Sequence, residues 1–200
     1  MFSGIVAGLG IVEHIEDKNQ FRHIRIRLPE GSKDNISQGA SIALDGVCLT
    51  VVEFSEHTAS FDIIDETLSR TTLSKVEIGD MINVERAIKY GDEIGGHKVT
   101  GHIDHMAEIT KIVTPENNHI VKLKIPERYM PYIIEKGFIA LDGCSLTIAE
   151  VFNDGINVCL IPETLRRTTF GFKKEGDFVN FEIEAFTKAI IDLVNRKKGE

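Results

Sequence analysis

Short stretches in which apolar and polar residues alternate dominate the hydrophobic pattern of this 200-residue chain. In His23–Leu28 (HIRIRL) every second side chain is apolar, which is typical of a strand with one buried face. Further runs of this kind in the first half are Ser41–Leu44, Leu49–Phe54 and Met81–Glu85. Turn-forming pairs such as Asp45-Gly46 separate them. About six such strands in roughly 90 residues predict a small closed barrel, because closure removes exposed strand edges.

The second half of the sequence repeats the first. DGVCLTV at 45–51 returns as DGCSLTI at 142–148, an offset of 97 residues (142 − 45), and the two halves align at this offset without a gap. Two halves that match without insertions predict two domains of one fold, which we place at 1–96 and 97–186. The predicted class is therefore all-β, with two similar barrels in tandem.

The C-terminal segment, 187–200, lies outside the repeat and is expected to be helical. An apolar stripe with i, i+3, i+4 spacing is formed by Phe186, Ala189, Ile190, Leu193 and Val194. Such a stripe either docks on the chain's own barrel or meets copies of itself in an oligomer. The pattern alone leaves both alternatives open.

Charge and cysteine content narrow the class of protein. The net charge of −8 disfavours a nucleic-acid partner or an anionic membrane surface, since both would repel the chain. No charged-then-apolar leader and no apolar run near the ~20 residues of a membrane span is present. Three scattered cysteines do not predict a disulfide framework, so we expect a cytoplasmic location. The sequence has no CxxC or HxxxH spacing, and we expect no metal site.

The repeat keeps hydroxyl groups beside its turns. Thr50 and Thr67 of the first half return as Thr147 and Thr164 of the second. Hydroxyls next to backbone amides can hold the edge of a polar heterocycle or a polyol chain. Threonines that favour strands and cap turns would look the same, so a binding role is one of two interpretations.

Reactive side chains break the symmetry of the repeat. Cys48 corresponds to Ser145, and His102 corresponds to Ile5. Two further breaks place Ser41 opposite Phe138 and Phe2 opposite Val99. A thiolate is a good nucleophile, and imidazole transfers protons near neutral pH. A cysteine in a strand is also commonly a small core residue, so a packing role stays open.

The two halves are joined by GDEIGGHKVTGHID at 91–104, whose glycines are also consistent with a plain linker. His97 and His102 are five positions apart and would point to opposite faces of a strand. This spacing disfavours a two-histidine metal site and suits one histidine presented to a cleft. Two like pockets with unlike reactive groups predict a reaction between two molecules of one ligand, which positioning would accelerate.

Six phrases in order cover nearly the whole chain: MFSGIV, DGVCLTV, DETLSRTTL, GGHKVTGHID, KGFIALDGCSLTI and LIPETLRRTT. Together they resemble the riboflavin synthase family of two-domain, lumazine-binding proteins. The resemblance implies two six-stranded Greek-key β-barrels and a C-terminal helix that holds a homotrimer. It also implies a transferase without a cofactor. Two molecules of 6,7-dimethyl-8-ribityllumazine would react by four-carbon transfer to give riboflavin and 5-amino-6-(D-ribitylamino)uracil. Lumazine synthase is a further expected partner.

The resemblance marks site residues in both halves. Those implied as catalytic are His102, Cys48, Ser41 and Phe2. Those implied as substrate-binding are Gly4, Ile5, Val6, Cys48, Leu49, Thr50, Asp62, Ile63, Ile64, Thr67, His102, Ile103, Asp104, Lys136, Asp142, Ser145, Leu146, Thr147, Leu160, Ile161, Pro162, Glu163, Thr164 and Leu165. The family's site lies between the first barrel of one subunit and the second barrel of its neighbour.

Chemistry suggests roles for three of these residues. We expect His102, with Ser41, to assist removal of a proton from the acidic 7-methyl group of one lumazine. Cys48 or a bound water would attack C7 of the other lumazine. Two departures from the family pattern are small: Ser3 replaces the more usual threonine, and Asp45 stands where asparagine is common.

Two other functions remain to be weighed. One is a non-catalytic lumazine- or flavin-binding protein of the same fold, of the light-emitting antenna type, in which much of the reactive set is lost. His102 and Cys48 are both present here, which favours catalysis. The other is a small-barrel oligonucleotide-binding module, which the acidic balance and the 7% aromatic content disfavour.

Overall fold

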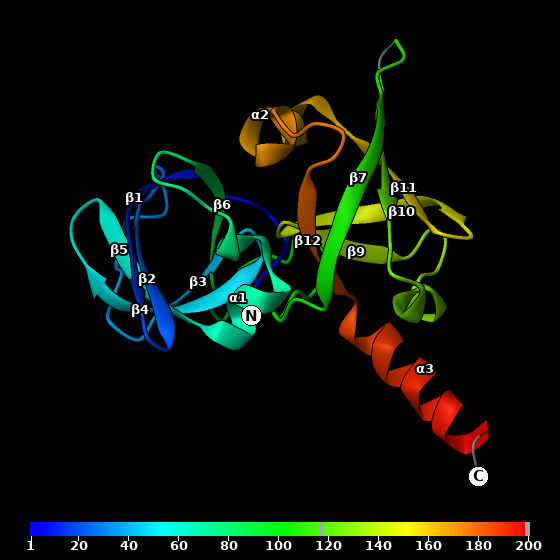
Figure 1. Ribbon diagram of the computed structural model, residues 1–200, viewed down its shortest axis with the longest axis horizontal. Helices are drawn as coiled ribbons and strands as arrows, with labels where there is room; N and C mark the ends of the chain where they lie inside the picture. Colours follow the sequence, from blue (N-terminus) through cyan, green and yellow to red (C-terminus); the bar gives the residue numbers. More distant parts are fainter. Residues whose placement is uncertain (117, 199–200) are drawn as a thin grey trace.

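Six antiparallel strands close the first barrel in the order β1-β2-β5-β4-β3-β6 (Figure 1). Their bounds are β1 Gly8–Lys18, β2 Phe21–Arg27, β3 Ser41–Leu44, β4 Val47–Phe54, β5 Thr58–Ile64 and β6 Met81–Arg86. The alternation in β2 has the predicted effect, because Ile24 and Ile26 are fully buried in the barrel while Arg25 and Arg27 are exposed. This is a computed structural model, and it describes residues 1–116 and 118–198.

The second barrel has the same connectivity. Read from its first strand, the ring runs β7-β8-β11-β10-β9-β12. Its strands are β7 His105–Val113, β8 His119–Lys124, β9 Phe138–Leu141, β10 Cys144–Phe152, β11 Gly155–Leu160 and β12 Phe178–Ile183. The all-β class, the two six-stranded barrels and the repeat are therefore confirmed.

Short helices follow equivalent strands of the two barrels. They are α1 Asp65–Arg70 with η1 Thr72–Ser74, and α2 Pro162–Arg167 with η3 Thr169–Gly171, while η2 spans Glu127–Tyr132. The strand pattern did not predict α1 and α2. Acidic residues in the first turn and basic residues in the last turn stabilise both helices. In α1, Glu66 and Arg70 form an i, i+4 ion pair at 2.5 Å.

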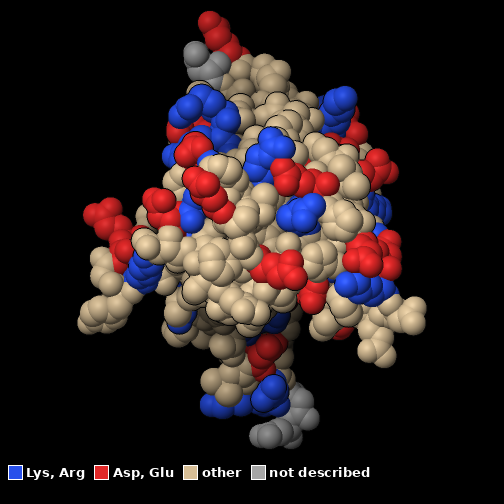
Figure 2. All heavy atoms as spheres, turned by 90° about the vertical axis from the view of Figure 1, so that its left-hand side faces the viewer, with Lys and Arg blue, Asp and Glu red and all other residues tan. Residues whose placement is uncertain are grey.

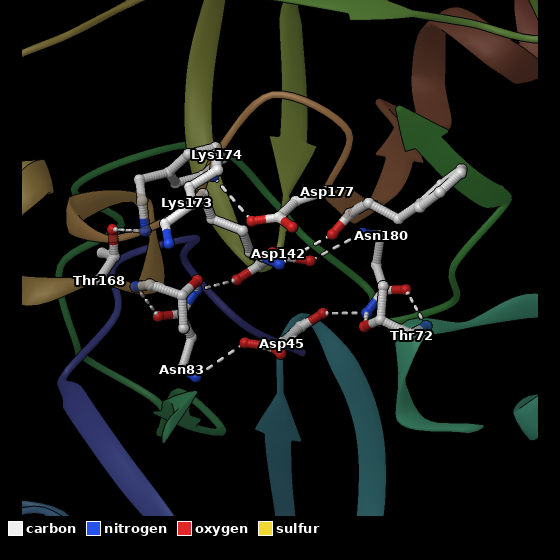
Figure 3. A network of polar contacts seen from close by, with 12 residues as sticks. Asp45, Thr72, Asn83, Asp142, Thr168, Lys173, Lys174, Asp177 and Asn180 are labelled. Carbon is white, nitrogen blue, oxygen red and sulfur yellow. Dashed lines mark hydrogen bonds and ion pairs between the residues drawn. The ribbon is translucent and has the colours of Figure 1, made fainter. Parts of the chain in front are cut away.

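A reciprocal hydrogen-bond network joins the barrels (Figure 3). In the first barrel, the Asn83 backbone N–H donates to Asp45 Oδ1 at 2.8 Å. In the second, the Asn180 N–H donates to Asp142 Oδ1 at 2.7 Å. The two asparagine side chains then cross over: Asn83 Nδ2 donates to the Asp142 carbonyl and Asn180 Nδ2 to the Asp45 carbonyl, at 2.8 and 2.9 Å. All four residues are buried, so the pairing fixes how the barrels sit against each other.

One lysine makes this network unsymmetrical. Lys173 Nζ lies 3.2 Å from Asp142 Oδ2, whereas the equivalent position beside Asp45 is Val76 (173 − 97). Burial, and then the nearby Asp142 carboxylate, hold the pKa of Asp45 well above its ordinary value. Burial therefore favours the protonated form of Asp45 over the charged form.

The chain ends in helix α3, Ala185–Lys198, which projects away from both barrels (Figure 1). Its first turns are tied down by an ion pair from Lys188 to Asp104 and by a hydrogen bond from the Tyr132 hydroxyl to Asp192 at 2.5 Å. Its stripe remains exposed at Phe186, Ile190, Leu193 and Val194. The predicted helix is present, although the last two residues of its predicted range, 199–200, lie outside the described residues. The exposed stripe disfavours docking on the chain's own barrel.

Candidate active site

A pocket of about 260 Å³ opens beside the first barrel. Cys48 and Thr67 come from β4 and α1 of this barrel. His102 and Ile103 come from the segment that precedes the second barrel. His102 is exposed and Cys48 half-buried, so both side chains can reach a bound molecule. Thiol, imidazole and hydroxyl groups therefore share one cavity.

A second pocket of about 180 Å³ lies at the equivalent position of the second barrel. Its lining includes the predicted residues Gly4, Ile5, Val6, Ser145, Leu146, Ile161, Glu163 and Thr164. The repeat offset maps every lining residue of the first pocket onto one of the second, and Leu146 and Ile161 are additional in the second lining. The first pocket holds a thiol and an imidazole where the second holds the Ser145 hydroxyl and the Ile5 side chain.

The segments that complete the two pockets are exchanged between the barrels. Gly4–Val6 begins the first half of the chain but lines the second barrel's pocket, and Gly101–Ile103 begins the second half but lines the first barrel's pocket. Where the two segments cross, Phe2 and Val99 form an antiparallel bridge with backbone hydrogen bonds of 2.8 and 3.1 Å. Each pocket therefore depends on both halves of the chain.

Backbone contacts hold each exchanged segment against its pocket. The Cys48 N–H donates to the Gly101 carbonyl at 2.9 Å, and the Ser145 N–H donates to the Gly4 carbonyl at 2.8 Å. Both glycines have positive φ, and a Cβ on Gly101 would lie 2.5 Å from the Cβ of Cys48. Only glycine allows this approach without displacing the cysteine. The glycine that recurs at the repeat offset is visible in the sequence, but only the structure shows the close contact that requires it.

Several other predicted residues of the first barrel lie on its outer face without lining the cavity. Ser41 pairs with Thr50 across β3 and β4, and Thr50 points to the same side as Cys48 two positions earlier. Asp62 and Ile64 are exposed on β5. Leu49 and Ile63 alternate with these residues and point into the barrel core.

In the second barrel, sequence reasoning gave no role to His97. Its Nδ1 lies 2.7 Å from Ser145 Oγ, and its ring stacks on Phe138 with centroids 5.2 Å apart. Burial lowers the pKa of His97, which favours the neutral imidazole. The five-residue spacing from His102 was the available signal: His102 lines the first pocket, whereas His97 contacts Ser145 of the second barrel without lining either cavity.

Several predicted residues lie away from both cavities. Phe2 is fully buried between the barrels, and Leu160 is buried in the second barrel's core. Asp142 belongs to the inter-barrel network, and Asp104 pairs with Lys188 of α3. Among the exposed predicted residues, Lys136 Nζ donates to the Ala149 carbonyl at 2.8 Å. Thr147 and Pro162 are also exposed, on β10 and α2, and Leu165 of α2 packs against the barrel core; none of the three lines the second cavity.

The electrostatic surroundings of the second pocket are set by an ion pair. Glu163 bonds Arg166 at 2.6 Å and lies 3.7 Å from Arg167. The hydrogen bond from Arg166 holds the pKa of Glu163 below its ordinary value, so this carboxylate is ionised at neutral pH.

Other kinds of site find little support in the described residues. Within 1–116 and 118–198 no group of three or more His, Cys, Asp or Glu side chains is placed to hold a metal ion. None of the helices described has the length and apolar character required to cross a membrane. Acidic and basic side chains are interspersed on the face that the first barrel presents in Figure 2, without a basic tract.

Two barrels with equivalent pockets define a protein with tandem ligand-binding domains. The model of the lumazine binding domain matches residues 3–87 and again 100–184. The riboflavin synthase of Escherichia coli (strain K12) is 48% identical to this chain, over 98% of the chain and 92% of that protein. The riboflavin synthase of Chlamydia muridarum is 40% identical over 100% of the chain and 98% of that protein.

Solved structures agree with these sequence matches. LumP complexed with 6,7-dimethyl-8-(1'-D-ribityl) lumazine is similar with a TM-score of 0.82 and 29% identity, over 91% of this chain and 98% of LumP. LumP complexed with riboflavin has a TM-score of 0.84 and 30% identity, over 92% of this chain and 100% of LumP. The chain belongs to the riboflavin synthase family of lumazine-binding proteins.

Proposed function

We propose that the protein is an enzyme that converts two molecules of 6,7-dimethyl-8-ribityllumazine into riboflavin and 5-amino-6-(D-ribitylamino)uracil. The observation that carries this function is the pair of equivalent pockets, of which only the first is lined by an imidazole together with a half-buried thiol, since Cys144 in the lining of the second is buried. Equivalent linings suit two molecules of one ligand. Unequal reactive groups suit different fates for the two molecules.

The pair His102 and Cys48 also separates this function from passive binding. A protein that only stores or displays a lumazine needs the hydroxyls and the backbone amides of the pocket. It has no need of a proton-transfer group and a nucleophile in the same cavity. We therefore prefer the catalytic function to the antenna function.

We propose the following roles in the reaction. His102, assisted by Ser41, takes the proton from the 7-methyl group of the lumazine in the first pocket, which leaves a carbanion stabilised by the heterocycle. Cys48 or a water molecule adds to C7 of the second lumazine. Both groups border the first pocket, so the second lumazine must reach the mouth of that pocket from the facing one. Two C–C bonds then form between the methyl carbons of the first lumazine and C6 and C7 of the second. The two C–N bonds that hold C6 and C7 in the second ring break and the added nucleophile leaves, so that four carbons pass from one ring to the other.

Two features support a site shared between chains. Each cavity is smaller than the roughly 300 Å³ of an ordinary closed ligand site. Ile5 and Ile161 line the second cavity and remain 48% and 64% exposed, and Ile64, which corresponds to Ile161 in the first barrel, is 58% exposed. We propose that a neighbouring chain covers them, so that the first barrel of one chain faces the second barrel of the next.

The assembly that fits these features is a homotrimer held by α3. The stripe on α3 is exposed in a single chain and would be buried between copies.

We also propose a cytoplasmic location, with which three free cysteines are consistent, and association with lumazine synthase, which rests on the family resemblance alone. The domain limits 1–96, 97–186 and 187–200 stay a prediction, as do the ligand contacts of the residues named above.

A direct assay tests this function. The purified full chain is incubated with 6,7-dimethyl-8-ribityllumazine alone, in the presence of a chelator, and riboflavin is followed by its absorbance. We expect one riboflavin for every two lumazines consumed. Tight binding without riboflavin would favour the antenna function, and absence of binding would exclude both.

A further inference from the structure

Each exchanged segment is held by a buried carboxylate from the barrel that does not contain its pocket. Glu182 of β12 accepts hydrogen bonds from the Thr100 backbone N–H at 2.7 Å, the Thr100 hydroxyl at 2.8 Å and the Gly101 N–H at 2.8 Å. Glu85 of β6 does the same for the first segment, accepting from the Ser3 N–H at 2.7 Å and from the Ser3 hydroxyl at 2.8 Å. Both carboxylates are about 95% buried.

Each carboxylate, with the hydrogen bonds that it accepts, forms a clamp on its segment. Only the clamp formed by Glu182 holds a segment that continues into a reactive residue. Beyond Gly101 the chain reaches His102, whose N–H donates to the Thr100 hydroxyl at 3.2 Å. Glu182, Thr100 and His102 thus form a continuous hydrogen-bonded path. On the other side of the segment, the Gly101 carbonyl accepts from the N–H of Cys48 at 2.9 Å. The segment is therefore fixed between the carboxylate of the second barrel and the cysteine of the first.

We propose that Glu182, a residue of the second barrel, is the positioning residue that sets His102 against Cys48 in the pocket of the first barrel. This inference rests on the proposed function, because it assigns a partner to the proton-transfer group of that reaction. Glu182 itself does not line the first pocket and acts through Thr100 and Gly101.

The carboxylate is not explained by packing alone. Burial raises the pKa of Glu182 although the hydrogen bonds from Thr100 and Gly101 lower it, so the charged form is held at a cost. An apolar side chain of the same size would fill the space without that cost, but it would leave two backbone N–H groups and one hydroxyl without an acceptor. A carboxylate is the side chain that can accept all three.

The first test replaces Glu182 by the isosteric glutamine. In Glu182→Gln one carboxylate oxygen becomes an N–H₂ group that faces a donor, so the segment must shift. A shift of about 1 Å at a reacting group costs up to roughly 100-fold in rate, so we expect kcat to fall by about 10- to 100-fold with a smaller change in KM. Glu85→Gln is the matched control, since it disturbs the equivalent clamp of a segment that carries Ile5 in place of a histidine.

A double-mutant cycle separates positioning from general support of the fold. If Glu182 acts through His102, Glu182→Gln lowers kcat in the native chain and has little further effect in a His102→Gln background. Glu85→Gln should reduce activity by the same factor in both backgrounds. An equal loss from Glu182→Gln in both backgrounds would show that Glu182 only supports the fold, and would overturn the proposal.

A second variant covers the case in which Glu182→Gln does not fold. Thr100→Val removes the hydroxyl in the path and keeps the shape of the side chain, and we expect it to lower kcat while the chain stays folded, with a modest fall in melting temperature from the lost hydrogen bond. Thr100→Ser, which restores the hydroxyl, should recover most of the loss. Equal activities of the two variants would contradict the path.

A readout that does not need turnover distinguishes this inference from the proposed function. The imidazole signals of His102, identified by their loss in His102→Gln, are followed by NMR in the full chain labelled at histidine. Glu182→Gln should move these signals and Glu85→Gln should leave them in place. If the native chain makes no riboflavin, the proposed function fails while this result still decides the positioning. Unmoved signals in Glu182→Gln would exclude it.

Discussion

At the scale of single residues, the two pockets differ in few side chains. Cys48 replaces the serine, and His102 replaces the isoleucine, of the equivalent pocket. The surrounding glycines and threonines are the same in both. Under the proposed function, the shared residues would bind the same ligand in both pockets, and the differing residues would carry the chemistry.

Replacing His102 tests whether a residue that differs between the pockets serves the chemistry rather than ligand binding. We expect His102→Gln to lower kcat by roughly 100-fold or less, because a general base commonly contributes 10²–10⁴-fold and the 7-methyl group is itself acidic. Lumazine binding, measured by fluorescence titration, should change little. His57→Gln is the control, since His57 is exposed and lies outside both pockets. An unchanged rate in His102→Gln would remove the proposed base.

At the scale of elements, the internal repeat predicted more of the fold than the alternation within individual strands did. The offset of 97 residues predicted two like barrels, and both strand rings have the same order. It did not predict the exchange of Gly4–Val6 and Gly101–Ile103, because an offset equates positions without saying which barrel a segment contacts. The contacts of His97 and Glu182 could not be predicted for the same reason. Each forms a hydrogen bond with a residue far away in the sequence, Ser145 and Thr100 respectively.

Helix α3 offers the prediction that belongs to this scale. Leu193 is 56% exposed within the apolar stripe, and burying a leucine contributes about 1.5–3 kcal/mol per chain. We expect Leu193→Glu to give monomers in place of the proposed trimer in sedimentation analysis and to abolish riboflavin formation, with each barrel still folded. Asn195→Glu adds the same charge outside the stripe and should stay trimeric. A trimeric, active Leu193→Glu would contradict the proposed role of α3.

At the scale of the whole molecule, the inter-barrel network sets the response to pH. The raised pKa of Asp45 means that the folded state keeps this proton to higher pH than the unfolded state does. The stability that depends on protonated Asp45 is fully present below the ordinary aspartate pKa of about 3.9 and is lost as pH rises through the raised pKa. The free energy of unfolding should therefore decline over this range because of Asp45.

Replacing Asp45 by asparagine should remove this pH dependence of stability. Asp45→Asn keeps an oxygen that can accept from the Asn83 N–H and cannot ionise. We expect it to raise the melting temperature at neutral pH, and to differ little from the native chain near pH 3.5. In contrast, Asp142→Asn should destabilise the chain at neutral pH, since Lys173 loses its partner. A lower melting temperature of Asp45→Asn at neutral pH would show that Asp45 is ionised in the folded state.

The arrangement of two pockets from two chains can be tested by restoring activity from two inactive variants. Gly101→Ala crowds Cys48 in the first pocket, and Gly4→Ala crowds Ser145 in the second, with added Cβ atoms 2.5 and 2.6 Å from the respective Cβ atoms. Each variant alone should make almost no riboflavin. When the two are co-expressed, a site formed between neighbours combines an intact first pocket from one chain with an intact second pocket from the other.

The decisive measurement is the rate of riboflavin formation by these hybrids, isolated through two different affinity tags. In a cyclic trimer that contains both variants, one of the three sites combines an intact first pocket with an intact second pocket, so roughly a third of the native rate should return. If both ligands were held within a single chain, every chain would carry a damaged pocket. A hybrid no faster than its parents would then rule out carbon transfer between neighbouring subunits.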